Sequence, residues 1–311
     1  MKSFLKLFIF LSVFMGFIIF VQPAEAKGVL SSWNNFWTKL GTSSLISTPK
    51  KSSSTLSSQQ SSVSEPKGAV SKTSVLYPEI SDSQIPAGFS RKDLSPYFNK
   101  ISISSAYSSS QGSTPSQIRI SSNLKKGEII DITGYKIKSN LKEIIIPQAV
   151  NIYEPLGFAP QENIVLSNNN YINIYSNTSP LNKNLRLNKC IGYLEDIYNF
   201  NPSLPQNCPS VPRSEITYLS GDCQNYIFSI GSCKLPDVSF YNAFPGTDQG
   251  NACRAFLNTI SHNTCYQKHR FDSDFLSNEW RVWTNYNILD PRHDWLWLFD
   301  KNGLLMDEYI Y

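Results

Sequence analysis

The last 17 residues of the chain constrain its fold more than any other stretch. Two apolar and aromatic runs, residues 295–299 and 304–311, flank the sequence Asp300-Lys301-Asn302-Gly303. Such runs favour β-strands, and Gly303 supplies the positive φ that a short hairpin needs. A lone hairpin is at best marginally stable in water. We therefore expect this hairpin to complete a sheet whose other strands lie much earlier in the chain. The residues between those strands and the hairpin would then form an insertion.

Earlier runs of the sequence predict the other strands of that sheet. Apolar residues alternate with polar ones, or form short apolar runs, at residues 100–104, 117–121, 128–138, 141–146, 163–166, 171–175 and 279–283. Gly, Pro, Asn and Ser separate these runs. Several short strands at near-regular spacing indicate a mainly β, sandwich-type fold rather than alternating strands and helices.

A cysteine-containing insertion is predicted at about residues 181–278, where the apolar period becomes helical. Residues 190–198 and 253–260 place their apolar side chains at helical spacing. The six cysteines of the chain all lie in this segment, and an even, clustered count in an exported chain indicates disulfides. Zinc is the alternative, although no C-x2-C pair is present. Because each loop would then close locally, we predict the pairs Cys190–Cys208, Cys223–Cys233 and Cys253–Cys265.

The N-terminus carries the features of an export signal. Lys2 and Lys6 precede an apolar run at residues 7–21, and Ala24-Glu25-Ala26 follows Pro23. This pattern predicts a secretory signal peptide at residues 1–26, cut after Ala26. The alternative is an uncleaved membrane anchor through residues 4–21, although this run is shorter than the roughly 20 residues of a membrane-spanning helix.

Residues 27–95 are predicted to form a Ser-rich flexible linker. Near its start, Trp33, Phe36 and Trp37 share one helical face, which suits contact with a membrane surface; the alternative is an unstructured start with a few apolar residues. Residues 27–75 carry six lysines and one glutamate, whereas the rest of the exported chain carries 20 basic and 22 acidic residues. That balance gives no basic face and argues against nucleic acid as a partner.

Several strand motifs resemble the lamin tail domain family, which also occurs in exported bacterial proteins. They are residues 117–123 (QIRISSN), 130–137 (IDITGYKI), 144–147 (IIIP) and the terminal segment 294–309, in which a D-x-x-G-type turn joins two apolar strands. The resemblance covers residues 97–180 and 279–311, and Tyr135 stands where the family usually has Trp. It implies an immunoglobulin-like β-sandwich spanning residues 96–311 around the insertion. It also implies binding or structural work, because the family has no catalytic residues to carry over.

Candidate reactive groups are few. No G-x-S-x-G motif accompanies the three histidines His262, His269 and His293, and His293-Asp294 is predicted to be a loop pair with local hydrogen bonds. Asp272, Asp274 and Glu279 could offer oxygen ligands to calcium, but they lack the EF-hand spacing. We interpret them instead as a cluster at a helix N-terminus.

Other charged and aromatic groups have structural interpretations. Lys125-Lys126 is predicted to be a solvated turn. Trp280, Trp283, Trp295 and Trp297 could form an exposed aromatic platform. Alternation places Trp295 and Trp297 on one face of their strand, which we expect to be the core face.

The sequence thus predicts an exported, non-catalytic module that needs no metal or cofactor and binds a protein or a cell-surface polymer. An exported hydrolase with its site in the insertion is the alternative, and a membrane-attached spacer is a third. A pocket that unites a histidine with Ser, Asp or Glu would favour the hydrolase. Scattered histidines beside an exposed polar or aromatic face would favour the binding module.

Overall fold

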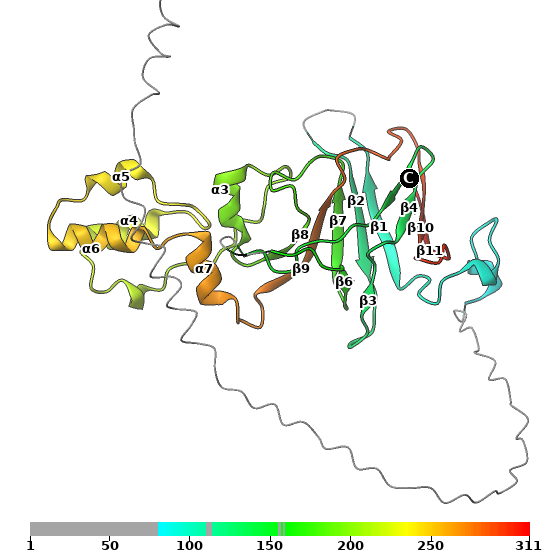
Figure 1. The fold of residues 1–311 in the computed structure, drawn as a ribbon, viewed down its shortest axis with the longest axis horizontal. Coiled ribbons are helices and arrows are strands. Elements are labelled where there is room, and N and C mark those ends of the chain that lie inside the picture. The colour runs from blue at the N-terminus through cyan, green and yellow to red at the C-terminus, as the bar shows by residue number, and fades with distance from the viewer. Residues whose placement is uncertain (1–79, 110–113, 155–156, 158) are drawn as a thin grey trace, which may run out of the picture. The chain divides into compact units, whose positions relative to one another are not determined.

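The computed structural model describes residues 80–109, 114–154, 157 and 159–311, and the chain is mainly β with three disulfides (Figure 1). The strands are β1 (Ile101–Tyr107), β2 (Gln117–Ser122), β3 (Ile130–Asp131), β4 (Lys136–Lys138), β5 (Glu143–Ile145), β6 (Val165–Leu166), β7 (Tyr171–Tyr175), β8 (Leu185–Asn188), β9 (Leu276–Trp283), β10 (Trp295–Phe299) and β11 (Leu305–Ile310). The α-helices are α3 (Glu195–Tyr198), α4 (Gly221–Ser229), α5 (Val238–Ala243), α6 (Asp248–Leu257) and α7 (His262–His269). Four 3-10 helices, η1 (Asp82–Gln84), η2 (Arg91–Asp93), η3 (Ile191–Leu194) and η4 (Arg213–Glu215), complete the elements of these residues.

The larger sheet joins the two distant parts of the chain. Its order is β1-β2-β7-β9-β8, and every neighbouring pair is antiparallel except β7 and β9. In that parallel pair Ile172 lies opposite Trp280 and Ile174 opposite Val282. A parallel pair requires a long connection between its strands, and the cysteine-containing insertion supplies it.

The terminal hairpin belongs to the smaller sheet, of order β11-β10-β4-β5. The turn is confirmed: Gly303 has a φ of 78°, and the Asp300 carboxylate accepts backbone hydrogen bonds from Asn302 and Leu304, both at 2.9 Å. Strand β10 then pairs with β4, so that Leu298 lies opposite Ile137. The hairpin therefore completes a sheet begun before the insertion, as the sequence predicts.

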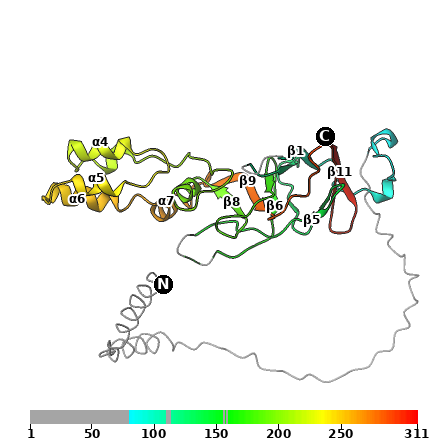
Figure 2. The same cartoon turned by 90° about the horizontal axis from the view of Figure 1, so that it is seen from above.

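One hydrophobic core is shared by the two sheets. Ile120, Ile172 and Trp280 of the larger sheet belong to the same buried cluster as Ile137 and Leu298 of the smaller one. Strands β1 and β11 also lie side by side in both views (Figures 1 and 2), where the Asp307 carboxylate accepts a hydrogen bond of 2.7 Å from the Ile103 backbone N–H. Burial of apolar area from both sheets, at roughly 25 cal/mol per Å², is the main force that holds them together.

Residues 80–95, which the sequence assigns to the linker, are packed on the smaller sheet. Leu94 is buried with Phe98 and Leu305, and Ile85 and Phe89 cover this cluster. The Ser95 backbone N–H donates to the carbonyl of Leu305 at 2.8 Å, and a bridge links Leu94 to Leu305. The part of the predicted linker before residue 80 lies outside the described residues.

The insertion begins after a strand that belongs to the larger sheet. Strand β8 lies within the predicted insertion, yet it pairs with β9. Helical spacing at residues 190–198 is confirmed by η3 and α3, and the pattern at 253–260 falls on α6, which begins earlier, at Asp248. Figure 1 shows α4, α5 and α6 in yellow and α7 in orange, grouped away from the strands, whereas α3, in green, lies nearer to β8.

The predicted disulfide pairs are wrong, although all six cysteines are paired. The bonds are Cys190–Cys265, Cys208–Cys233 and Cys223–Cys253, with Cα atoms 5.7, 5.1 and 5.9 Å apart, within the range that disulfides adopt. The packing of the helices decides the pairs rather than local loop closure. Cys223 and Cys253 meet because α4 and α6 share one small core.

Residues 200–203, near the start of the insertion, pack on the outer face of the larger sheet. The Arg281 guanidinium on β9 donates to the carbonyls of Pro202 and Ser203, both at 3.0 Å. Phe200 packs on Trp283, with ring centroids 6.0 Å apart. These contacts hold the segment that leads from the larger sheet into the helices of the insertion.

Candidate functional site

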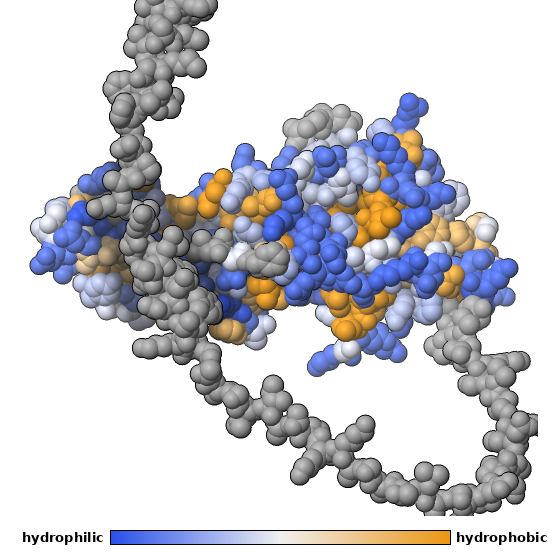
Figure 3. Space-filling view, in the orientation of Figure 1, coloured by the Kyte–Doolittle hydropathy of each residue, from blue (hydrophilic) through white to orange (hydrophobic). Residues whose placement is uncertain are grey.

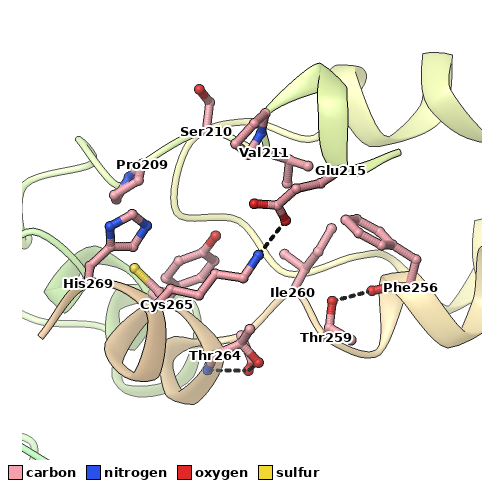
Figure 4. Close-up of a pocket in the computed structure, with 14 residues that line it drawn as sticks. Pro209, Ser210, Val211, Glu215, Phe256, Thr259, Ile260, Thr264, Cys265 and His269 are labelled. Carbon is pink, nitrogen blue, oxygen red and sulfur yellow. Dashed lines mark hydrogen bonds and ion pairs between the residues drawn. The ribbon is translucent and has the colours of Figure 1, made fainter. Parts of the chain in front are cut away.

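A pocket of about 360 Å³ lies within the insertion (Figure 4). Its apolar wall comes from the 209–212 segment and from the end of α6, and its polar wall comes from α7 and η4. The lining residues are Tyr193, Pro209, Ser210, Val211, Pro212, Glu215, Phe256, Thr259, Ile260, Ser261, Thr264, Cys265, Lys268 and His269. Apolar walls with a few polar groups are typical of ligand-binding pockets.

Helix α7 provides most of the polar wall, because side chains at helical spacing along it face the pocket. Ser261 is its N-cap, and its hydroxyl accepts a hydrogen bond from the Thr264 backbone N–H at 3.2 Å. Residues three and four apart share one face of a helix, so Thr264, Lys268 and the disulfide-bonded Cys265 line the pocket together. The Cys190–Cys265 bond ties this helix to the end of β8.

The charged groups of the pocket are engaged in pairs. Lys268 Nζ lies 2.5 Å from the carboxylate of Glu215 (Figure 4), and His269 Nδ1 lies 2.9 Å from the carboxylate of Asp272. Hydrogen bonds from His269 and then Lys189 hold the pKa of Asp272 below its usual value. Within the described residues His269 Nε2 makes no hydrogen bond, so this nitrogen is free to meet a ligand or a water.

The hydroxyl groups of the pocket are not arranged as nucleophiles. Thr259 Oγ1 donates to the carbonyl of Phe256 at 2.7 Å, and Ser261 Oγ donates to Thr264 Oγ1 at 3.2 Å. The Ser210 hydroxyl points away from His269 in Figure 4. The pocket does unite a histidine with serines and a glutamate, but among the described residues no hydroxyl is hydrogen-bonded to that histidine, which nucleophilic catalysis requires.

Sequence reasoning named His269 but missed Glu215 and Lys268. Lys268 follows Ser261 and Thr264 at helical spacing behind a serine N-cap, which is a readable signal. Glu215 lies in a short 3-10 helix 53 residues before its partner, and the sequence gives no signal for that contact.

The other two histidines lie apart from the pocket lining. His262 is buried at the start of α7, and burial lowers its pKa to about 4. His293 Nδ1 lies 2.6 Å from the carbonyl of Tyr311, and the buried Asp294 carboxylate accepts backbone hydrogen bonds from Asn140 and Trp295 at 2.9 and 2.8 Å. The pair lies in a loop as predicted, but its hydrogen bonds are only partly local, because Tyr311 and Asn140 are 18 and 154 residues from their partners.

The predicted acidic cluster at a helix N-terminus is wrong. Asp272 and Asp274 follow the C-terminal end of α7 and bind Lys189 Nζ at 3.0 and 2.5 Å. Glu279 lies on β9, where it binds Arg281 Nε at 2.7 Å. The described residues contain no group of three or more side chains arranged to hold a metal ion.

The predicted core face of β10 is also wrong. Leu296 and Leu298 are fully buried in the shared core, so Trp295 and Trp297 face outward and are half-buried. Their rings stack at 5.4 Å with an interplanar angle of 18°, and Trp297 packs against the cluster around Leu94. Trp280 and Trp283 are buried, so the four tryptophans do not form one exposed platform.

The remaining predictions concern the surface of the protein. Lys125 and Lys126 are exposed at a turn, as predicted. On the face shown in Figure 3, hydrophobic side chains reach the surface in several separate patches. None of the helices in the described part of the chain is long and apolar enough to cross a membrane. Trp33, Phe36, Trp37 and the predicted signal peptide lie outside the described residues.

Comparisons of the chain with protein-family models, with curated proteins and with solved structures found no match.

Proposed function

We propose that the chain is an exported, non-catalytic binding module of the lamin tail domain type, whose insertion contacts a protein or a cell-surface polymer. Two sheets built from both parts of the chain around one core support an immunoglobulin-like sandwich. The strand motifs quoted above support the family. Three disulfides are compatible with an extracellular protein.

The main support for this proposal is that most polar groups in the 360 Å³ pocket are already bonded to neighbouring residues. Lys268 is already paired with Glu215, the Thr259 and Ser261 hydroxyls are engaged locally, and the wall formed by residues 209–212 and the end of α6 is apolar. Such a hollow can bury an apolar group of a partner and orient it with a few rim charges. Among the described residues, no hydroxyl of the pocket is hydrogen-bonded to His269, as the nucleophile of a covalent hydrolase would be.

The hydrolase remains a second candidate because of one observation. Asp272 binds Nδ1 of His269 and leaves Nε2 free at the pocket wall, which is the orientation of a histidine that removes a proton from water. This candidate predicts turnover that depends on His269 and Asp272.

One experiment separates the two candidates. The purified full chain is incubated with isolated bacterial cell envelopes, and bound protein is measured after sedimentation. The binding module predicts saturable binding that Val211→Asp, in the pocket wall, weakens by roughly tenfold. The matched control Ile129→Asp, at a position 67% exposed and outside the insertion, keeps the affinity.

The same protein is assayed against chromogenic esters, glycosides and peptides. Turnover that His269→Gln abolishes, together with envelope binding indifferent to Val211→Asp, would overturn the proposal in favour of the hydrolase. N-terminal sequencing of the exported protein tests the location, because cleavage after Ala26 predicts Lys27 as its first residue.

A further inference from the structure

We propose that residues 209–212 form a recognition segment for an extended peptide that carries two apolar side chains and an acidic residue. This inference rests on the proposed binding function and names its ligand. The sequence of the segment is Pro209-Ser210-Val211-Pro212, and we call it the PSVP segment.

Two apolar hollows lie beside the PSVP segment. The first is the 360 Å³ pocket, and the second, of about 130 Å³, is lined by Ile227, Phe228 and Ile230 among others. Both are lined by the same five residues, Tyr193, Pro209, Ser210, Val211 and Ile260. A ligand that crosses the segment can therefore place one apolar side chain in each hollow.

The backbone of the PSVP segment is unpaired where a peptide would meet it. Within the described residues, the N–H and C=O groups of Ser210 and Val211 make no hydrogen bond, and Ser210 is exposed. Pro212 holds an extended conformation with φ −65° and ψ 138°. An extended segment with free donors and acceptors pairs well with a second extended chain, whose alternate side chains then provide specificity.

Each hollow has a lysine at its lining that remains accessible to a ligand carboxylate. Lys268 lines the first hollow and Lys234 the second, whereas Glu215 is the one carboxylate among the two sets of lining residues. The lysine side chains remain 47% and 50% exposed despite their pairing with Glu215 and Asp196. A ligand carboxylate can therefore join either ion pair from the solvent side, which favours approach of an acidic peptide.

The test uses the purified full chain and three sets of labelled short peptides, with binding followed by fluorescence anisotropy. The first set has two leucines, separated by one, two or three serines and flanked by aspartates. The second set replaces the leucines with serine, and the third replaces the aspartates with lysine. At least one peptide of the first set should bind about tenfold more tightly than its leucine-free partner, and more tightly than its lysine-flanked partner.

Two matched variants then test the backbone contact. Ser210→Pro removes the N–H of residue 210 and keeps an extended chain, whereas Ser210→Ala removes the hydroxyl alone. We expect Ser210→Pro to lose about tenfold in peptide affinity and Ser210→Ala to bind like the parent chain. Thermal unfolding midpoints confirm that each variant is folded, and Val211→Asp provides a second disrupting change if Ser210→Pro does not fold.

The inference is overturned if no two-leucine peptide binds more tightly than its leucine-free partner, or if the disrupting variant binds like Ser210→Ala. Either result leaves the proposed function standing, provided that envelope binding still depends on Val211. Envelope binding indifferent to Val211→Asp, together with turnover that depends on His269, would remove the proposed function itself, so the two failures are distinguishable.

Discussion

The Tyr171 hydroxyl lies 3.1 Å from the carboxylate of Glu279, although the two residues are 108 positions apart in the chain. They occupy neighbouring positions on the parallel strands β7 and β9. The same carboxylate accepts hydrogen bonds from Asn173 at 3.0 Å and from Arg281 at 2.7 Å. One acidic side chain thus links the strand before the insertion to the strand after it.

We expect Glu279→Gln to lower the free energy of unfolding by about 2 kcal/mol. The Glu279 and Arg281 side chains are 11% and 7% exposed, so the change leaves a buried cation without its counter-charge. Urea unfolding measures the loss. In the double variant Glu279→Gln/Arg281→Met the loss should fall short of the sum of the single losses, because the two residues interact directly. Additive losses would show that the pair contributes no coupling.

We predict that Leu298→Ala destabilises the chain by about 2–5 kcal/mol, the cost of emptying a core position. Trp295→Ala should cost less despite its larger side chain, because Trp295 is half-buried on the outer face while Leu298 is fully buried. Denaturant midpoints of the two variants check the order. A larger loss for Trp295→Ala would mean that the tryptophans face the core.

Stability should fall as the pH drops from about 6.5 toward 4 because of His262. Burial lowers its pKa from 6.5 to about 4 in the folded chain, so in this window the unfolded chain binds a proton that the folded chain does not. A shift of this size corresponds to at most about 3 kcal/mol. Replacing His262 with Gln should flatten the decline, and thermal unfolding at a series of pH values measures it. A decline that persists unchanged in this variant would contradict the assignment.

Asp307 acts in the opposite direction. Burial raises the pKa of its carboxyl from 3.8 to about 6, so between these values the folded chain binds the extra proton and stability rises as the pH falls. The two groups therefore oppose each other between pH 4 and 6. Asp307→Asn should unmask a steeper acid loss than the parent chain shows. The same pH series measures this, and an identical slope would show that Asp307 does not titrate in that window.

The strand pattern was readable from the sequence, but the inward face of β10 was not. Residues 295–299 read Trp-Leu-Trp-Leu-Phe, so both faces of the strand are apolar and alternation cannot say which one is buried. The packing of Leu94 and Phe98 on the outer face explains why Trp297 is tolerated there. That contact joins residues far apart in the chain, so local spacing does not reveal it.

For the candidate site, the sequence predicted only that it would lie in the insertion. The sequence placed a disulfide-stabilised insertion between the two halves of the sheet, but helical spacing was found only at residues 190–198 and 253–260, and α7 at His262–His269 was not predicted. The pocket itself depends on the Lys268–Glu215 contact and on which cysteines meet. Both follow from the packing of short helices, and a count of residues between cysteines does not determine them.

Disulfide mapping of the unreduced protein is the most direct test, because two of the three observed bonds border the PSVP segment and its hollows. Cys190–Cys265 borders the first hollow, and Cys208–Cys233 precedes the PSVP segment and borders the second. Proteolysis without reduction, followed by mass spectrometry, should yield linked peptides for Cys190–Cys265, Cys208–Cys233 and Cys223–Cys253. Free thiols, or links between cysteines adjacent in sequence such as Cys190–Cys208, would contradict the arrangement of the insertion and the binding site built on it.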